Sequence, residues 1–309
     1  MERQIISGHI AAIITITIWS TTYIATKVLL NDFTPIEILL IRFSIGFLTL
    51  KLLWPKGIGF NIKQEPYYIL AGLTGVCLYF LVENIALTKT TACNVGIILA
   101  ITPLFTAIAT KIFYPQEKKL SLGFYIGFLA SFIGILILSL KGSEIAINPV
   151  GDLLAVFAGI IWSIYSVLTK KINNFGFNAI QVTRRTFLYG LIFIIPISLC
   201  YGINTDIEKL TKTENIFNLL FLGVGASAIC FASWNFAVKA IGAVSTIIYL
   251  YATPSITIIF AYLILDEKLT MAGIVGCILI TIGLVISQGF FQLGYKYITT
   301  KYCTKNKQK

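Results

Sequence analysis

An arginine stands inside a long apolar stretch of the sequence, where a charge needs a partner or a function. Arg42 lies seven residues after Pro35, about 10 Å along a helix that begins at that proline. Arginine at such a depth usually faces a cavity or a partner. It could bind the carboxylate or phosphate of a ligand, or it could hold helix ends together by bonding their carbonyl groups. Arg184 and Arg185 occupy the corresponding place in the second half of the chain, and one of them is expected to extend to the membrane interface.

Glu83 is the acid that lies well inside an apolar stretch, whereas the other acids fall in predicted loops, tails or outermost turns. Its carboxyl group could bind the ammonium group of a ligand or carry a coupled proton. The alternative is a salt bridge with Lys27 or Lys89, which are predicted to lie at a similar depth. The sequence is compatible with both interpretations.

Aromatic residues recur at helical spacing in the same stretches. Trp19 and Tyr23 are four residues apart, Trp162 and Tyr165 are three apart, and such spacing places side chains on one helix face. Rings of this kind are common at the membrane interface, but Trp19 and Trp162 lie near the middle of their stretches. This position favours a cavity that would suit an apolar or aromatic substrate, or a cation held by ring faces. The candidate cavity residues are Trp19, Tyr23, Arg42, Tyr79, Glu83, Asn84, Trp162, Tyr165, Arg185, Trp234, Asn235 and Tyr251.

Two prolines near the middle of apolar stretches are predicted hinges. Pro103 and Pro254 each follow a threonine, and proline removes a backbone hydrogen bond and kinks a helix. Kinked helices in the core of a carrier can act as hinges, although a static kink would need no functional role. The two asparagines among the cavity candidates, Asn84 and Asn235, have the alternative role of bonding a neighbouring helix.

The residues that would form a metal centre or a hydrolytic site are poorly represented. His9 is the one histidine, whereas a bis-histidine haem, an HExxH zinc site or a Ser-His-Asp triad would need further histidines or partners. There is no GxxxxGK[ST] motif for nucleotide binding. The six cysteines form no CxxC pair, and most fall inside apolar runs. We therefore expect no metal and no cofactor.

The composition excludes a water-soluble domain. The 309 residues are 57% hydrophobic and 12% charged, with a mean hydropathy of +0.87, whereas soluble chains are about 25% charged. The same figures exclude disorder and a disulfide scaffold. The net charge of +11 could suggest nucleic acid, but most bases lie between long apolar runs, which is typical of the loops of a membrane protein. The expected partners are membrane lipid and a small-molecule substrate, with no nucleic acid.

Ten stretches are long enough to span a bilayer, which takes about 20 apolar residues. They lie at residues 8–30, 35–54, 67–87, 94–114, 121–140, 151–171, 177–201, 215–238, 244–265 and 271–291. The connecting segments are short, so the sequence predicts an all-α integral membrane protein. The first stretch is too long for a signal peptide, and it is predicted to be a retained span.

The distribution of bases predicts the orientation of these spans. If the N-terminus is cytoplasmic, fifteen lysines and arginines fall on the cytoplasmic side, including five in a basic tail at 292–309. Six fall on the other side: Lys27, Lys89, Lys141, Lys209, Lys212 and Lys268. The positive-inside bias therefore predicts a multi-pass protein with both termini in the cytoplasm. The preference for lysine over arginine points to a bacterial inner membrane.

The two halves of the chain repeat one another in order. At an offset of 143, Trp19-Ser20 corresponds to Trp162-Ser163 and Arg42 to Arg185; at 151, Asn84 corresponds to Asn235. Each half, 1–145 and 146–291, has five predicted spans, an odd number that requires the second copy to be inserted upside down. Inverted repeats place substrate sites near the membrane midplane between two halves that rock against each other.

This pattern resembles the EamA branch of the drug/metabolite transporter superfamily. The residues that carry the likeness in the first half are Trp19-Ser20, Pro35, Arg42-Phe43, Asn84-Ile85-Ala86-Leu87, Thr102-Pro103-Leu104, Glu117, Gly127 and Gly134. Their counterparts are Trp162-Ser163, Arg185, Asn235-Phe236-Ala237, Thr253-Pro254-Ser255, Glu267, Gly276 and Gly283. The resemblance implies a central cavity lined by spans 1–4 and 6–9, with spans 5 and 10 packed together at one end. One departure, Asp266 where the family often has glycine, is expected to affect a loop turn.

The resemblance also implies a secondary transporter that exports amino acids or drug-like amphiphiles by alternating access. We expect it to act as a monomer or homodimer and not to be an enzyme. The rival within transport is a sugar or nucleotide-sugar carrier of the same superfamily, in which arginines would bind a phosphate. Rivals from other classes are a membrane-embedded enzyme, which the scarcity of histidine disfavours, and a non-transporting membrane interaction protein, which the duplication disfavours. The sequence leaves substrate, direction of transport and proton coupling open.

Overall fold

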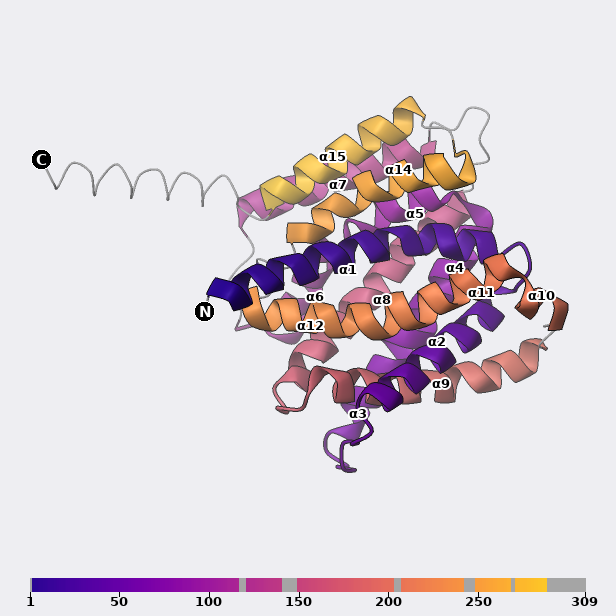
Figure 1. The fold of residues 1–309 in the computed structure, drawn as a ribbon. Helices are drawn as coiled ribbons and strands as arrows, with labels where there is room; N and C mark the ends of the chain where they lie inside the picture. Colours follow the sequence, from indigo (N-terminus) through magenta and orange to yellow (C-terminus); the bar gives the residue numbers. More distant parts are fainter. Residues whose placement is uncertain are drawn as a thin grey trace, which may run out of the picture.

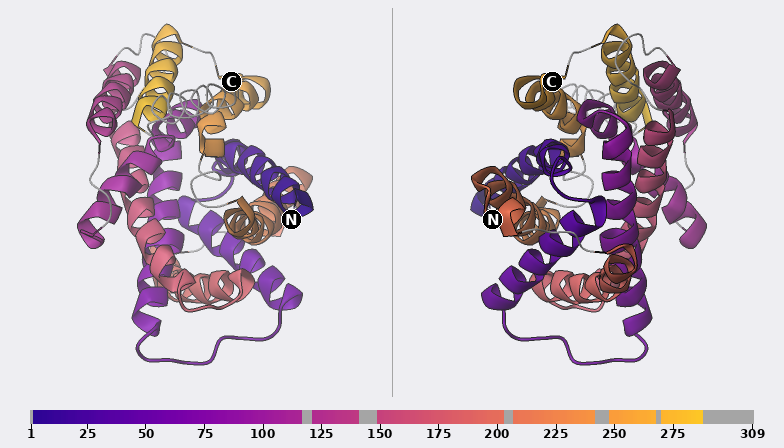
Figure 2. Two further views of the ribbon diagram at one scale, coloured as in Figure 1. Left: turned by 90° about the vertical axis from the view of Figure 1, so that its left-hand side faces the viewer. Right: turned by 90° about the vertical axis from the view of Figure 1, so that its right-hand side faces the viewer.

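The computed structural model describes residues 2–116, 121–140, 149–202, 207–241, 248–267 and 270–287. Every regular element in these ranges is a helix, and none is a strand. The helices pack into one bundle, in which some run side by side and others cross at an angle (Figures 1 and 2). Many large apolar side chains on the outside of this bundle are exposed, and Leu52, at 82%, is an extreme case. An apolar outer surface fits a protein surrounded by lipid.

The first half of the chain forms a series of helical rods, some of them composite. The helices are α1 (Glu2–Leu29), α2 (Pro35–Leu53), α3 (Glu65–Gly72), the π-helix η1 (Leu73–Leu78), α4 (Tyr79–Lys89), α5 (Ala92–Leu99), α6 (Thr102–Phe113) and α7 (Leu122–Leu140). Helices α3, η1 and α4 follow one another without a break.

The second half follows the same plan. Its helices are α8 (Pro149–Asn173), α9 (Ala179–Tyr201), the short α10 (Ile207–Thr211), α11 (Thr213–Leu220), the π-helix η2 (Phe221–Ile229), α12 (Cys230–Ile241), the 3₁₀-helix η3 (Ile248–Ala252), α14 (Thr253–Leu265) and α15 (Met271–Ser287). Each of the ten predicted apolar stretches overlaps helical residues in the described ranges.

Six helical segments of the described chain are long and apolar enough to cross a membrane. They are Gln4–Leu29, Glu65–Lys89, Ala92–Phe113, Pro149–Asn173, Ala179–Tyr201 and Thr213–Trp234. Shorter apolar helices lie at Leu122–Ile137, Thr253–Leu265 and Met271–Gly283. Helix α2 is outside both groups, and its 19 residues carry Glu37, Arg42 and Lys51. The protein is therefore a multi-pass membrane protein.

Local sequence signals explain where several helices begin and end. Thr34 and Glu37 form a capping box at the start of α2, where Pro35 occupies the first turn. Asp266 ends α14 in the left-handed conformation, with φ of 52°. Because a residue without a Cβ adopts that conformation most easily, the aspartate departs from the family pattern at a position that favours glycine. The departure therefore falls at the end of a helix.

The packing of the helices repeats when the two halves are exchanged. Helix α1 packs on α12 as α8 packs on α4, and α2 packs on η2 as α9 packs on η1. Likewise α1 packs on α14 as α8 packs on α6, while α2 contacts α9 and α5 contacts α14. Helices α7 and α15 pack mainly on each other, at one edge of the bundle (Figures 1 and 2). The structure thus carries the duplication that the sequence offsets predict.

Small residues allow the close approach of α7 and α15. A Cβ atom added at Gly134 would lie 2.8 Å from the Gly276 carbonyl oxygen, and one added at Gly283 would lie 2.4 Å from the Gly127 carbonyl oxygen. These distances leave no room for a side chain at position 134 of α7 or at position 283 of α15. The glycines noted in the repeat therefore serve helix packing.

The two predicted hinge prolines begin helices instead of kinking them. Pro103 lies in the first turn of α6, after a break in the α-helix at Ala100 and Ile101. Pro254 lies in the first turn of α14, directly after η3. Proline is tolerated in a first turn because the backbone N–H that it lacks would have no partner there. The expectation of one kinked helix at each site is therefore wrong in its local detail, although each position is a joint between two helical segments.

Candidate functional site

A cluster of aromatic rings lies where the two halves of the chain meet. Trp19 of α1 contacts three rings of the second half, with ring centroids 6.5 Å away for Trp162, 5.5 Å for Phe231 and 5.3 Å for Trp234. Edge-to-face geometry between Trp19 and both Trp162 and Phe231 is the favourable arrangement for aromatic quadrupoles. The structure thus brings the predicted site residues Trp19, Trp162 and Trp234 together.

Trp162 extends this cluster toward α4. Its ring centroid lies 4.7 Å from that of Tyr79 and 4.9 Å from that of Tyr165. The Tyr165 ring packs directly on the backbone of η1, and a Cβ at Gly75 would overlap it at 2.2 Å. A glycine in the π-helix thus makes room for a tyrosine from the other half of the chain.

The π-helix η2 supplies hydrogen-bond partners to the first half. Its Ala226 carbonyl accepts a hydrogen bond of 3.0 Å from the indole Nε1 of Trp19. The Ser227 hydroxyl accepts a hydrogen bond of 2.9 Å from Nε of Arg42. π-helical turns are rare and often lie at functional sites, because they shift the hydrogen-bond register and re-aim the residues within them. Here η1 and η2 occupy corresponding places in the two halves and both border the aromatic cluster.

Arg42 is buried, with 2% of its surface exposed. Besides its bond to Ser227, its guanidinium lies over the Phe80 ring, 4.3 Å from the centroid. A cation–π contact without water contributes about 2 kcal/mol. The second interpretation of Arg42, as a bond between helices, describes this geometry, although the acceptor is a hydroxyl and not a carbonyl.

Glu83 has a different environment from every other acid described in the structure. It is 1% exposed, and neither carboxylate oxygen has a hydrogen-bond partner among the described residues. The expected alternative, a salt bridge with Lys27 or Lys89, is wrong for the described side chains. Lys27 instead donates to the backbone oxygens of Leu87 and, at 2.8 Å, of Thr90.

The groups that act electrostatically on Glu83 are the Arg42 guanidinium and the Tyr79 hydroxyl. Tyr23 in turn experiences the charges of Glu83 and Arg42. Burial of an unpaired charge costs several kcal/mol, so a carboxylate in this place is compensated by a nearby cation or by a bound donor. The cluster therefore combines the Glu83 carboxylate as an acceptor, the Arg42 guanidinium as a fixed cation, and several aromatic rings.

Two of the predicted site residues lie elsewhere. Arg185 bonds both carboxylate oxygens of Glu65, and Tyr189 donates to the same carboxylate at 2.5 Å, so this arginine joins α9 to α3. Asn84 donates to the Pro35 carbonyl at 3.2 Å and joins α4 to the start of α2. Both make the contacts between helices that buried polar residues usually make. The side chains of Asn235 and Tyr251 lie outside the described part of the chain.

Sequence reasoning missed Ser227, Phe80 and Gly75 as parts of the site. Ser227 falls in the small-residue run 223–228, a composition that indicates only close helix packing. Phe80 could have been identified from the sequence as the neighbour of Tyr79, and its ring centroid is 5.0 Å from that of Phe43. Nothing in the local sequence marks Gly75 as the residue beneath a tyrosine of the other repeat.

The fold and the site define a class of protein: a multi-pass helical membrane protein built from two related halves, with a polar and aromatic site between them. The EamA-like transporter family matches the chain over residues 6–140 and 149–288. The chain belongs to this family. Its class is therefore transport and not catalysis.

Relatives over most of the chain are transporters. An uncharacterized transporter from Archaeoglobus fulgidus is 25% identical over 285 residues, which cover 90% of this chain and 96% of the relative. A protein from Streptantibioticus cattleyicolor, named a probable terminal-alkyne amino-acid exporter, is 22% identical over 270 residues, 86% of this chain and 88% of that protein. A solved crystal structure of a protein 19% identical to this chain has the same fold, with a TM-score of 0.65 over 91% of this chain and 95% of that chain.

Proposed function

We propose that this protein is a secondary transporter that exports a small organic metabolite, an amino acid or a drug-like amphiphile, by alternating access. The observation that carries the proposal is the buried Glu83 carboxylate without a hydrogen-bond partner, one turn from Tyr79 on α4, whose ring contacts Trp162 of the other half. A carboxylate of this kind binds an ammonium or hydroxyl donor, and the rings bind the apolar part of the same molecule.

The proposed topology has ten membrane spans in two inverted repeats, 1–145 and 146–291, with both termini and the tail 292–309 in the cytoplasm. The symmetric exchange of helix contacts supports the repeat, and the distribution of lysines supports the orientation. Inverted repeats allow a site between the halves to face one side of the membrane and then the other as the halves rock. The proposed compartment is the inner membrane of a bacterium.

The arrangement of the arginines favours this proposal over a sugar-nucleotide carrier. A phosphate site would need arginine N–H groups that face the substrate. Arg42 bonds Ser227 and lies on Phe80, and Arg185 bonds Glu65. The cluster therefore offers rings and a carboxylate more readily than a cation.

The proposal is tested with purified protein in proteoliposomes and a panel of amino acids and amphiphilic amines. Trp162→Ala should lower the flux of a transported compound about tenfold, since the ring contacts Trp19, Tyr79 and Tyr165. The matched control is Phe157→Ala, which removes an exposed ring from the same helix and should leave flux unchanged. Equal flux in both variants would contradict the site, and absence of flux for the whole panel would contradict the substrate class.

Glu83→Gln separates two roles of the carboxylate. The substitution keeps the shape of the side chain and removes its charge. If Glu83 pairs with an ammonium group, the variant should raise the KM for amines while neutral amphiphiles are transported as before. If it carries a coupled proton, the variant should instead lose the dependence of flux on a pH gradient. A variant that changes neither quantity would assign Glu83 no part in transport.

A further inference from the structure

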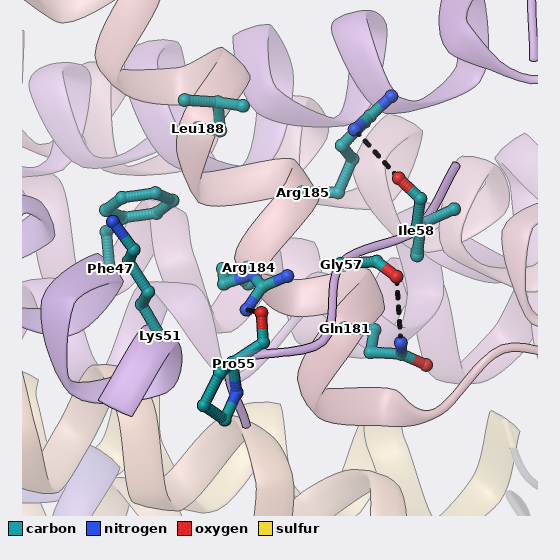
Figure 3. Close-up of a pocket in the computed structure, with 9 residues that line it drawn as sticks. All are labelled: Phe47, Lys51, Pro55, Gly57, Ile58, Gln181, Arg184, Arg185 and Leu188. Carbon is teal, nitrogen blue, oxygen red and sulfur yellow. Dashed lines mark hydrogen bonds between the residues drawn. The ribbon is translucent and has the colours of Figure 1, made fainter. Parts of the chain in front are cut away.

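A polar pocket that shares no lining residue with the aromatic cluster lies between the end of α2, the segment after it and the first half of α9 (Figure 3). Its volume is about 200 Å³. Three cations line it, Lys51, Arg184 and Arg185, and no acid does. The Glu65 carboxylate, which does not line the pocket, forms an ion pair with Arg185 and neutralises that arginine. Lys51 and Arg184 therefore leave the pocket with two uncompensated positive charges.

Hydrogen bonds between side chains and backbone hold the frame of this pocket. Arg184 donates from Nη1 to the carbonyls of Trp54 at 2.5 Å and Pro55 at 3.1 Å. Gln181 donates to the carbonyls of Lys56 at 3.1 Å and Gly57 at 3.2 Å. The segment after α2, which crosses beneath α9 in Figure 2, is thereby tied to the first turns of α9. A preformed frame lowers the entropic cost of binding a ligand.

Gly57 keeps one side of the Arg184 guanidinium uncovered. A Cβ atom at this glycine would lie 3.1 Å from Nη2 of Arg184, so any larger residue would press on the nitrogen that the two carbonyls leave available. Figure 3 shows the Arg185 guanidinium turned toward the Ile58 carbonyl, 3.3 Å away. The acceptor that fits the remaining N–H groups of Arg184 and the Lys51 ammonium is an anion such as a phosphate.

The walls of the pocket are continuous with the apolar outside of the bundle. Phe47 and Leu188 form its apolar lining. Leu188 and Ile192 lie one turn apart on α9, and both are exposed, as is Leu52 at the end of α2. An anion seated at Lys51 and Arg184 would thus have an acyl-sized apolar track beside it, which a free phosphate would not use.

We propose that this pocket binds the headgroup of an anionic phospholipid, with its acyl chains along Leu188 and Ile192. The choice of leaflet rests on the orientation proposed above, which places Lys51 and the start of α9 on the cytoplasmic side. Basic pockets between helices at that surface are suited to anionic headgroups. The lipid joins α2 of the first half to α9 of the second and is separate from the transported substrate.

Lipid retention measured by native mass spectrometry tests the site on the full-length protein. The purified protein is mixed with equal amounts of phosphatidylglycerol and phosphatidylcholine, and wild type should retain the anionic lipid preferentially. Lys51→Ser should reduce that preference about fivefold, the contribution of one lysine near a headgroup. Lys63→Ser removes an exposed charge from the segment that follows α2 and should leave the preference unchanged.

Three outcomes would overturn the proposal. Equal retention of both lipids by wild type would mean that no anionic headgroup site exists. An equal loss of the preference for anionic lipid in Lys51→Ser and Lys63→Ser would show that the effect comes from general surface charge. Complete displacement of the lipid by excess inorganic phosphate would show a site for free phosphate. Arg184→Gln is a second variant, and it should lower retention further if it stays folded by size-exclusion chromatography. None of these readouts depends on transport, so they stand or fall separately from the proposed substrate.

Discussion

Two helix-end contacts occupy corresponding places in the repeat, yet they are built from different chemistry. At one, the start of α8 meets the end of α4: a Cβ at Gly151 would lie 2.8 Å from Cβ of Lys89. At the other, the start of α1 meets the end of α12: a Cβ at Gly8 would lie 2.8 Å from Cβ of Ala240. The residue after each glycine then differs, Asp152 in one contact and His9 in the other.

The Asp152 contact is buried and bears several charges. Asp152 is 2% exposed and accepts hydrogen bonds from Thr90 at 2.8 Å and Asn94 at 3.4 Å. Beside it, Glu267 accepts from the backbone N–H groups of Ala92 at 2.9 Å and Cys93 at 3.0 Å. A carboxylate at a helix N-terminus is stabilised by both the free N–H groups and the helix dipole.

The His9 contact is smaller in its described residues. A single hydrogen bond of 2.7 Å joins Nδ1 of His9 to the Tyr249 hydroxyl, and both side chains are half-buried. Hydrogen bonds to charged groups contribute about twice as much as neutral ones. For the hydrogen bonds of the described residues, the comparison therefore predicts a weaker coupling at His9 than at Asp152.

The largest effect is expected from adding a methyl group at the two glycines. In Gly151→Ala the new Cβ would lie 3.0 Å from the backbone nitrogen of Thr90, which cannot move independently of its helix. In Gly8→Ala one of the crowded atoms is Cγ2 of Ile241, which can rotate away. Overpacking costs about 1–3 kcal/mol. Gly151→Ala should therefore lower thermal stability and flux, the latter about tenfold, and Gly8→Ala should lower both less. Larger losses in Gly8→Ala than in Gly151→Ala would refute the assignment of the tighter contact to Gly151.

Double-mutant cycles give the next largest effect and measure each contact directly. The cycle of Asp152→Asn with Thr90→Val should return a coupling energy of about 1.5–3 kcal/mol, because a buried charge accepts the bond. The cycle of His9→Phe with Tyr249→Phe should return about 0.5–1.5 kcal/mol. Unfolding of the purified protein in mild detergent supplies the free energies. Equal couplings would show that the chemical difference has no energetic consequence.

The sequence predicted the helices and the repeat because both depend on short-range patterns. A run of apolar residues forms a helix in lipid whatever its neighbours, and the offsets between Trp19 and Trp162 or Gly8 and Gly151 survive as corresponding positions in space. The joints at Pro103 and Pro254 were located correctly but were expected inside helices. A proline in the first turn and a proline in the middle of a helix look alike until the preceding hydrogen bonds are known.

The aromatic cluster was predicted in part, for a physical reason. Trp19, Trp162 and Trp234 are apolar and lie deep in their stretches, so their side chains have few possible positions other than the interior. The Arg185 side chain has several possible positions, because it is long and can reach different acceptors. The Glu65 carboxylate that it bonds stands 120 residues earlier in the chain. The π-helices were not predictable from local sequence, since their register depends on packing such as that of Tyr165 on Gly75.

The smallest effect is expected at an exposed ion pair, which contrasts with the buried Asp152. Lys212 donates to both oxygens of Asp32 at 2.9 and 3.0 Å, and Asn215 donates to one of them at 2.8 Å. The bonds from Asn215 and Lys212 lower the pKa of Asp32 below its ordinary value. A carboxyl group whose pKa is lower in the folded state stabilises the fold above its unfolded pKa, and this contribution is lost as the pH falls through the folded pKa.

Asp32→Asn should therefore reduce thermal stability slightly at neutral pH and not at all at a pH below the lowered pKa. Added salt should shrink the difference further, because the pair is in contact with water and screened. Flux should change by less than about twofold, the range of an exposed pair. Thermal unfolding of wild type and variant across an acidic pH series, at low and high salt, measures the effect. A loss of thermal stability as large as that of Asp152→Asn, or one that persists in high salt, would contradict the contrast between buried and exposed contacts. It would mean that these helix ends depend on the exposed pair as strongly as on the buried acid.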